Sequence, residues 1–276
     1  FMWFGTRDGL NRFDGYTFRI FRKDPSNPKS IGNDHINSLL QDENEMIWVG
    51  TQNGLYKFNP VDQGFEHIAS TAEKHAKNLY KDNHGVLWLT LNDTLTTFDP
   101  AKGTMHQFSG FKTTSVCSDQ YGTLWVSTKD GFLQKFNRAD QRFTAFDMYS
   151  KSPKPNSRMI EKIYDTKQGS LLVGTLAGGI KLLDIKTGDY KDIVIYNQDK
   201  TAMYAKTFIQ YGENEYWAGT EIGLVIYDLI TGKASSLSIE YNNMYSLSDN
   251  AIHTLWKDKE GGVWVGTRFG GICYYP

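Results

Sequence analysis

One short pattern recurs seven times along the chain, and it constrains the fold more than any other feature of the sequence. The pattern is an aromatic residue or Leu, an apolar residue, Gly, Thr, two variable residues, Gly and Leu, as in residues 48–55. Its copies begin at Trp3, Trp48, Trp88, Trp125, Leu172, Trp217 and Trp264, roughly 40–50 residues apart. Six of the seven tryptophans lie at this one position, and only Trp256 does not. The chain is therefore built from similar repeated units.

Each unit contains four short apolar runs separated by turn residues. In residues 31–68, runs rich in Ile, Leu, Trp and Phe alternate with clusters of Asp, Asn, Gly and Pro. Four strands in a repeat of this length are typical of a propeller blade. One twisted sheet cannot bury both of its faces alone, but stacking on its neighbours around an axis buries them. We therefore predict an all-β fold, a β-propeller of about seven four-stranded blades that forms a single domain over residues 1–276.

The repeated residues have separate expected roles within a blade. The Trp is predicted to pack between adjacent blades, the Gly to permit close approach of the neighbouring sheet, and the Thr to offer a hydroxyl to the following turn. The copies at Trp88 and Leu172 depart most from the pattern. The first unit lacks its first strand and the last lacks its fourth, so we expect both blades to be incomplete, with the missing strands in flanking sequence. A ring of six blades with one hybrid blade made from both ends is an alternative that would duplicate the second and third strands.

Composition excludes several classes of protein. The net charge is −1, with 30 Lys and Arg against 31 Asp and Glu, so nothing suggests a nucleic-acid or membrane-surface partner. The two cysteines, Cys117 and Cys273, fall inside expected strands and are predicted to be small buried apolar residues rather than a disulfide scaffold. No run of about 18 apolar residues predicts a membrane-spanning helix, and no signal peptide is visible. Because the chain opens in the middle of an expected strand without Met, we expect it to be an excerpt of a longer protein.

The sequence around the repeated Trp resembles a known family. Residues 30–36 read Ser-Ile-Gly-Asn-Asp-His-Ile and lead to Asp42 and Trp48; residues 246–252 read Ser-Leu-Ser-Asp-Asn-Ala-Ile and lead to Asp258 and Trp264. The opening residues 1–16 fit the same pattern. This arrangement resembles the two-component regulator propeller repeat, found in the sensor half of hybrid two-component systems of Bacteroidetes. The resemblance covers essentially the whole chain.

The resemblance implies a sensor in the periplasm, in the ectodomain of an inner-membrane protein. Proteins of this family carry two propellers and a small sandwich domain, followed by a membrane helix, a histidine kinase and usually a DNA-binding output. Their typical signals are breakdown products of complex polysaccharides. The chain would be one propeller, the N-terminal one, with the second propeller and the sandwich domain as partners in the same chain. The full-length protein would form a homodimer, and this domain would contact no nucleic acid.

The recurring acidic residues are predicted to be structural. Asp42, Asp82, Asp119 and Asp258 each lie six residues before a repeated Trp and begin a turn, where a short carboxylate accepts backbone N–H bonds. The six histidines are scattered without the spacing of metal ligands, so no metal site is expected. No nucleophile elbow or phosphate-binding Gly loop is present. We therefore predict no catalytic residues and no cofactor for this domain.

A ligand site, if the propeller has one, is expected on one rim. The loops between second and third strands should emerge on the same face as the long loops that join successive blades. These segments are rich in Tyr, Asn, Lys and Arg, which suit sugar rings and anionic uronates through stacking and bidentate hydrogen bonds. The candidate ligand-binding residues are Arg7, Lys129, Tyr149, Arg158, Tyr204, Glu221, Tyr245, Arg268 and Phe269.

Three functional hypotheses remain open at this stage. The first is a non-enzymatic sensor in which an oligosaccharide changes the orientation of the propellers and thereby signals to the kinase. The second is a glycoside hydrolase or lyase, which needs two carboxylates about 5–10 Å apart; Asp34, Glu221 and Asp249 are not excluded, but no acidic pair stands out. The third is a scaffold that supports a neighbouring domain and contacts no small ligand.

Overall fold

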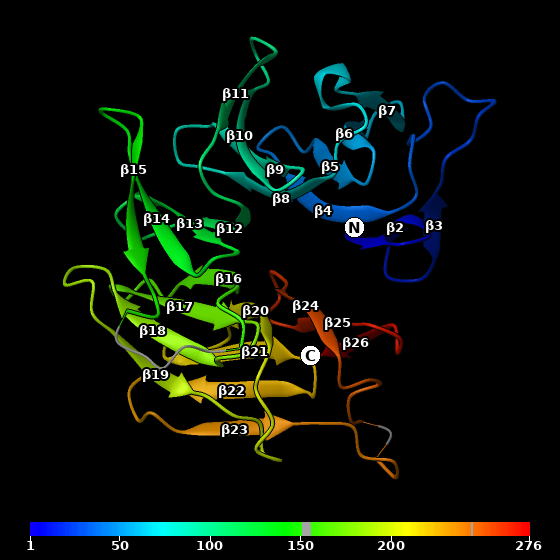
Figure 1. Ribbon diagram of the computed structural model, residues 1–276. Helices are drawn as coiled ribbons and strands as arrows, with labels where there is room; N and C mark the ends of the chain where they lie inside the picture. Colours follow the sequence, from blue (N-terminus) through cyan, green and yellow to red (C-terminus); the bar gives the residue numbers. More distant parts are fainter. Residues whose placement is uncertain (151–155, 244) are drawn as a thin grey trace. The chain divides into compact units, whose positions relative to one another are not determined.

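The computed structural model describes residues 1–150, 156–243 and 245–276, and these residues form β-strands, turns and one short 3-10 helix (Figure 1). The chain has the β-propeller fold, with seven consecutive antiparallel sheets that we number as blades 1 to 7. Blades 2 to 6 have four strands, whereas blades 1 and 7 have three. The predicted fold class is therefore confirmed, including the incomplete first and last blades. None of the described residues forms a helix that could span a membrane.

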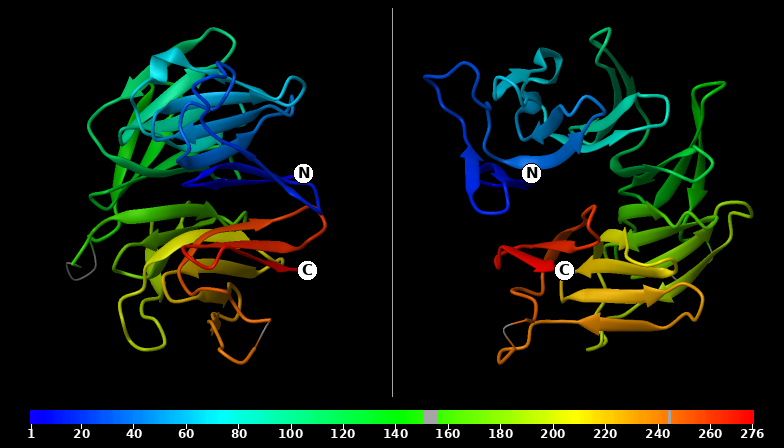
Figure 2. Two further views of the ribbon diagram at one scale, coloured as in Figure 1. Left: turned by 90° about the vertical axis from the view of Figure 1, so that its right-hand side faces the viewer. Right: turned by 180° about the vertical axis from the view of Figure 1, so that it is seen from behind.

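The contacts of the chain group it into two compact units, Phe1–Val116 and Cys117–Pro276. Blades 1 to 3 lie in unit 1, coloured blue to cyan-green in Figure 2. Their strands are β1 (Met2–Thr6), β2 (Gly9–Phe13), β3 (Phe18–Phe21), β4 (Ile36–Gln41), β5 (Ile47–Thr51), β6 (Gly54–Asn59), β7 (Gly64–His67), β8 (Ala76–Lys81), β9 (Leu87–Leu91), β10 (Thr94–Asp99) and β11 (Thr104–Phe108). The 3-10 helix η1 (Ala69–Thr71) connects blades 2 and 3.

Blades 4 to 7 belong to unit 2, except for the first residues of β12, which precede the boundary. Their strands are β12 (Thr113–Ser118), β13 (Leu124–Thr128), β14 (Phe132–Asn137), β15 (Arg142–Asp147), β16 (Ile160–Asp165), β17 (Ser170–Thr175), β18 (Ile180–Asp184), β19 (Tyr190–Val194), β20 (Ala205–Gln210), β21 (Glu215–Thr220), β22 (Leu224–Asp228), β23 (Ala234–Leu237), β24 (Ile252–Lys257), β25 (Val263–Thr267) and β26 (Ile272–Tyr275). The prediction that residues 1–276 form one domain stays a prediction.

The repeated Trp packs between adjacent blades, as predicted. Trp125 of blade 4 is 1% exposed and belongs to one apolar cluster with Ile163 and Leu171 of blade 5. Trp48 of blade 2 likewise clusters with Leu89 of blade 3. Because these two indoles cover the face of the next sheet, the facing surfaces of those blades leave water, and this burial stabilises the stack within each unit.

The Asp six residues before the Trp holds both the turn and the indole. In blade 4, Asp119 Oδ1 accepts the backbone N–H groups of Tyr121 and Thr123, each at 2.9 Å, and its Oδ2 accepts Nε1–H of Trp125 at 2.8 Å. The same indole bond joins Asp42 to Trp48, Asp82 to Trp88, and Asp258 to Trp264. The predicted turn role of these aspartates is confirmed, and the indole bond is a further role that the spacing did not reveal.

The repeated Gly and Thr also behave as predicted. A Cβ atom on Gly50 would lie 2.7 Å from the carbonyl oxygen of Ala76 in blade 3, and one on Gly219 would lie 2.6 Å from Cγ2 of Ile252 in blade 7. Only Gly therefore fits where two neighbouring sheets approach most closely. Thr51 Oγ1 donates a hydrogen bond to the Gly54 carbonyl at 2.9 Å and thereby closes the turn after the strand.

Blades 5 and 3 depart most from the repeat, and each has other residues at the repeat positions. In blade 5, Leu172 takes the Trp position at 1% exposure and Thr166 takes the Asp position, so the carboxylate and the indole are both replaced. In blade 3, Asn92 and Asp93 form the turn between β9 and β10 with φ of 48° and 67°. Asn and Asp tolerate this left-handed region better than other non-Gly residues.

Candidate ligand-binding site

The turn between the second and third strands of a blade is tied to the inter-blade loops on either side. The Gln52 N–H donates to the His35 carbonyl just before β4, and the Gly54 N–H donates to the Lys74 carbonyl just before β8. In blade 7 the Arg268 N–H donates in the same way to the Ala251 carbonyl. The expectation that these two sets of loops share one rim is confirmed at these positions.

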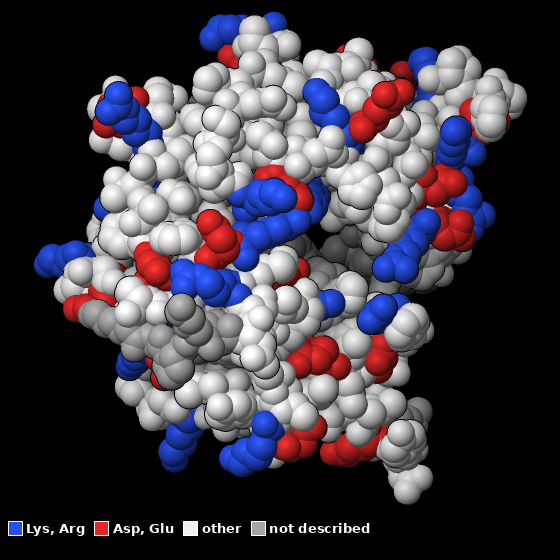
Figure 3. Space-filling view, viewed as in Figure 1, with Lys and Arg blue, Asp and Glu red and all other residues white. Residues whose placement is uncertain are grey.

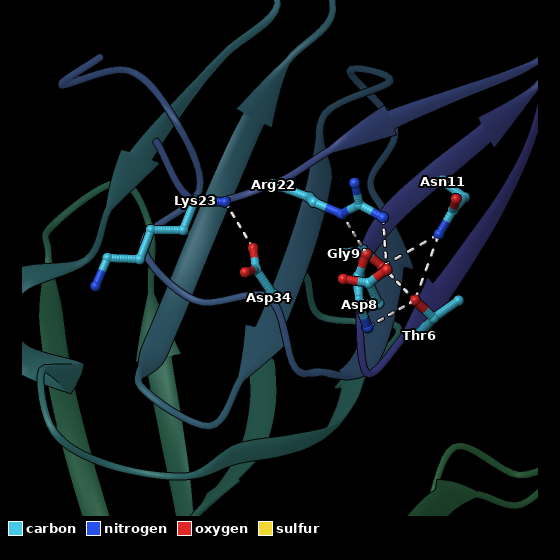
Figure 4. Close-up of polar contacts among 7 residues, drawn as sticks. All are labelled: Thr6, Asp8, Gly9, Asn11, Arg22, Lys23 and Asp34. Carbon is cyan, nitrogen blue, oxygen red and sulfur yellow. Dashed lines mark hydrogen bonds and ion pairs between the residues drawn. The ribbon is translucent and has the colours of Figure 1, made fainter. Parts of the chain in front are cut away.

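Figure 4 shows how the rim of unit 1 is held at the β1–β2 turn. Thr6 Oγ1 accepts the Asp8 N–H at 3.0 Å, while the Arg22 guanidinium donates to both the side chain and the carbonyl of Asp8. Asp34 Oδ1 accepts the Lys23 N–H at 2.6 Å. These polar groups are hydrogen-bonded to one another, so the backbone of the turn is fixed.

A β-bulge marks the first strand of several blades. Between a buried anchor residue and the next paired residue, the register skips one position in β4, β16, β20 and β24. The skipped residues are Asn37, Glu161, Lys206 and His253. A bulge leaves its extra residue outside the ladder and redirects its side chain. The structure thus places a polar side chain at one repeated position of the first strand.

In unit 2 the bulged residues of blades 6 and 7 meet. Lys206 Nζ lies 3.1 Å from His253 Nε2, although the two residues are 47 positions apart in the chain. The same ammonium lies 4.8 Å from the centroid of the Tyr204 ring. Burial lowers the pKa of Lys206; the Glu161 carboxylate opposes this shift, and the Arg268 guanidinium adds to it. These five side chains and Glu221 are called the inner-strand cluster below.

The acidic members of the inner-strand cluster differ in how they are satisfied. Glu221 accepts the Tyr204 N–H on both carboxylate oxygens, at 3.1 and 3.0 Å, and Asn197 Nδ2–H at 3.4 Å. Burial, followed by the negative charge of Glu161 and a hydrogen bond to it, raises the pKa of Tyr204. In the described part of the chain, Glu161 Oε2 is buried and accepts no hydrogen bond.

Next to the cluster stands an exposed aromatic ring. The Arg268 guanidinium carbon lies 5.0 Å from the centroid of the Phe269 ring, and Phe269 is 82% exposed. The Phe269 N–H donates to Asp249 Oδ2 at 2.9 Å, which fixes the backbone of this turn. The cluster and this ring therefore place basic, acidic and aromatic side chains near one another in unit 2.

The structure brings some of the predicted residues together and separates others. Tyr204, Glu221 and Arg268 belong to the inner-strand cluster, and Phe269 adjoins it. Arg7 is exposed in the β1–β2 turn of unit 1, and its charge contributes, after burial, to lowering the pKa of His35. Lys129 is exposed in the β13–β14 turn. Tyr245 is 81% exposed in the loop before β24.

Tyr149 and Arg158 form a second arrangement in unit 2. Tyr149 is only 5% exposed, and both the Arg158 guanidinium and the Lys181 ammonium lie 5.2 Å from its ring centroid. Arg158 Nη2 also donates to Asp147 Oδ1 at 2.6 Å. This ring packs between blades 4 and 5, so neither of its faces is available to a sugar. The inner-strand cluster is therefore the better candidate site.

The sequence analysis missed Glu161, Lys206 and His253. Each directly follows the buried first residue of its strand, Ile160, Ala205 or Ile252, all of which are 0% exposed. A polar residue at this one repeat position was the available signal. Among the described residues, no group of three or more His, Cys, Asp or Glu could hold a metal ion. On the face drawn in Figure 3, basic and acidic residues are interspersed.

The chain resembles known proteins in sequence and in structure. Residues 30–53 match the family model described as "Two component regulator propeller". This segment matches one copy of the repeat whose resemblance was recognised in the sequence. Histidine kinase P4 of Formosa agariphila is 60% identical over 30 residues, which are 11% of this chain and 2% of that protein.

Two solved structures illustrate the fold of the repeat. The extracellular domain of the hybrid two component system BT4673 from B. thetaiotaomicron matches 99% of this chain with a TM-score of 0.85 and 20% identity. This chain spans only 36% of the length of that extracellular domain. Virginiamycin B lyase from Staphylococcus aureus matches 87% of this chain and 84% of its own with a TM-score of 0.65 and 12% identity. Both likenesses establish the propeller fold, which therefore occurs in the extracellular domain of a two component system and in a lyase.

Proposed function

We propose that this chain is an extracytoplasmic sensor propeller of a hybrid two-component system that detects oligosaccharides released from complex polysaccharides. The observation that carries the proposal is the two component regulator propeller repeat, together with the likeness of 99% of the chain to the extracellular domain of such a system. The inner-strand cluster supplies donors, acceptors and a nearby aromatic ring, the side-chain types that bind sugars.

The signalling role follows from how a propeller responds to a ligand. Closely packed blades resist internal deformation. We therefore expect a ligand bound at a rim to change the contacts with neighbouring domains without unfolding the propeller. We propose a second propeller and a sandwich domain of the same protein as these neighbours, in a homodimer in the periplasm. The bound state then biases a histidine kinase and its transcriptional output.

The three carboxylates that the sequence did not exclude as catalytic groups accept hydrogen bonds from backbone N–H groups. Both oxygens of Glu221 accept the Tyr204 N–H, Asp34 accepts the Lys23 N–H, and Asp249 accepts the Phe269 N–H. A carboxylate that fixes a loop in this way is poorly placed to exchange protons with a substrate. This arrangement favours binding over hydrolysis or elimination.

Calorimetry and product analysis on the intact ectodomain test the proposal. We expect heat of binding with at least one class of oligosaccharide, and an unchanged oligosaccharide after prolonged incubation. Kinase autophosphorylation of the full-length protein in liposomes should change with the same ligand. Cleavage of the oligosaccharide would support the hydrolase or lyase, and the absence of binding to any glycan, with capture of a protein partner instead, would refute the sensor function.

A further inference from the structure

We propose that the free edge of β3 binds an extended segment of a partner protein, one that carries an acidic residue between two apolar residues. In blade 1, β3 is the last strand of the sheet and pairs with β2 on one side, and no described strand pairs with its other edge (Figure 1). An unpaired edge offers backbone N–H and C=O groups to a further strand. This surface lies in unit 1, apart from the inner-strand cluster.

The side chains of β3 distinguish it from the outer strands of the other blades. Phe18 and Ile20 lie on one face of the strand and are 53% and 47% exposed, whereas the exposed Arg19 lies between them on the other face. Among the corresponding strands, β23 exposes one large apolar side chain, Leu237, and β7, β11, β15 and β19 expose none. The edge of β3 is therefore both unpaired and apolar.

Arg19 also ends a row of side chains that crosses the sheet from the repeated Trp. In blade 1, Trp3 is paired with Arg12 in β2, and Arg12 is paired with Arg19 in β3. Like charges directly opposite each other on neighbouring strands are destabilising. The corresponding pairs are Lys57 and Glu66 in blade 2, Thr97 and His106 in blade 3, Lys135 and Thr144 in blade 4, Leu182 and Lys191 in blade 5, and Ile226 and Ser235 in blade 6. Of these described pairs, that of blade 1 alone sets two arginines against each other.

No carboxylate of the described residues neutralises this arginine pair. Neither Arg12 nor Arg19 has an acidic side chain within ion-pair distance. In the same region, Asp14 accepts hydrogen bonds from its own turn, and Asp8 is paired with Arg22. The two acidic residues beside the hairpin are therefore bound to other groups.

Aromatic rings hold the two guanidinium groups in place without cancelling their charge. The Arg12 guanidinium carbon lies 5.9 Å from the centroid of the Trp3 ring, and that of Arg19 lies 5.0 Å from the centroid of the Phe21 ring. Such contacts attract a cation to the ring face, but the positive charge remains. The pair can still form charge-assisted hydrogen bonds with an incoming carboxylate.

These features together specify the strand that fits the edge. An acidic residue opposite Arg19 would continue the row with the opposite charge, and apolar residues on either side of it would cover Phe18 and Ile20. A second copy of β3 does not fit, because antiparallel pairing that sets Phe18 against Ile20 also sets Arg19 against Arg19. A small anion could compensate the two arginines, but it would leave the backbone edge and the apolar side chains uncovered.

Synthetic cyclic β-hairpins test the proposal on the intact ectodomain. Their outer strand reads Thr-Val-Glu-Val-Thr, with Gln or Lys in place of Glu in two further hairpins, and binding is measured by fluorescence anisotropy. We expect the Glu hairpin to bind about three- to tenfold more tightly than the Lys hairpin, with the Gln hairpin between them. A version of the Glu hairpin with N-methylated amides on its outer edge should bind about tenfold or more weakly, because it cannot donate the main-chain hydrogen bonds.

A charge reversal links the binding to β3. The Arg19→Glu variant should reverse the preference, so that the Lys hairpin binds more tightly than the Glu hairpin. This variant should fold, since it replaces a like-charge pair with Arg12 by an opposite-charge pair. The matched control is Lys191→Glu, because Lys191 is also exposed and takes the position of Arg19 in blade 5. We expect the control to keep the preference for the Glu hairpin.

Several results would overturn the proposal. They are no binding of the Glu hairpin, equal binding of the Glu and Lys hairpins, or a preference that Arg19→Glu leaves unchanged. Undiminished binding of the N-methylated hairpin would rule out strand pairing, and displacement of the Glu hairpin by an equal concentration of sodium sulfate would indicate a simple anion site instead. Each of these results leaves the proposed sensor function untouched, because that function is tested with oligosaccharides.

Discussion

Replacement of Asp119 by Asn should reveal how much the bond to the repeated indole stabilises a blade. Asp119 is 4% exposed, and the side-chain amide of Asn can keep the two backbone bonds through its oxygen. Its NH₂ group would then face Nε1–H of Trp125, where the carboxylate now accepts at 2.8 Å. Two hydrogen-bond donors, the amide NH₂ and the indole N–H, would then face each other in a buried position. The charge-assisted hydrogen bond is lost and the indole N–H has no acceptor. We expect a loss of about 2–4 kcal/mol in the free energy of unfolding.

Differential scanning fluorimetry and urea unfolding measure this change. For a chain of this size, the loss corresponds to a fall in Tm of about 4–8 °C. The matched control is Asp184→Asn, because Asp184 Oδ1 also accepts two backbone N–H groups, from Lys186 and Thr187 at 2.8 Å, but is exposed and has no indole partner. We expect no resolvable change in Tm for this control.

A double-mutant cycle isolates the indole bond. Blade 5 carries Thr166 and Leu172 where blade 4 has Asp119 and Trp125, so the double variant Asp119→Thr with Trp125→Leu reproduces a pair that occurs in the chain. The double variant should lose less stability than the sum of its two single variants. Strict additivity, or an Asp119→Asn variant no less stable than the Asp184→Asn control, would refute the reasoning.

Three further predictions follow from the packing, the carboxylates and the thiols. Gly219→Ala should cost about 1–3 kcal/mol because its Cβ would overlap Ile252 at 2.6 Å, whereas Gly212→Ala, with 3.5 Å to its nearest neighbour, should be near neutral in urea unfolding. Backbone N–H bonds lower the pKa of Asp249, and those of Asp14 and Asp228 likewise, so the unfolded state binds more protons than the folded state as the pH falls. Burial also lowers the pKa of His35 and His67, so the unfolded state protonates these imidazoles at a higher pH than the folded state does. Tm should fall slightly between about pH 7 and 5 and steeply below about pH 4, and a level Tm down to about pH 3 would contradict this. Cys117 is half-buried, and desolvation of its thiol raises the pKa of that thiol. The Cys273→Ser variant should therefore react with a thiol reagent at about pH 8 only slowly until it is unfolded, and rapid labelling of the native protein would contradict the raised pKa.

The residues of the candidate ligand site could be predicted only in part from the sequence. The turn residues Glu221, Arg268 and Phe269 could be proposed because loop position follows from the repeat. Lys206 and His253 could not, because strand alternation says which face a residue takes but does not reveal a bulge that redirects one side chain. Their 3.1 Å contact also joins two blades and residues 47 positions apart, and no local pattern encodes that proximity.

The sequence by itself determined the architecture, since every blade repeats the same short-range rules. The positions of Trp, Gly and Thr specify strand, close approach and turn within a few residues, so seven imperfect copies predict seven sheets. The tertiary structure alone decided which polar groups meet. Asp119 reaches its indole, and Lys206 reaches the imidazole of the next blade, because sheet twist and strand register set the distances between side chains. Hydrogen bonds act over about 3 Å, a scale that the repeat pattern does not specify.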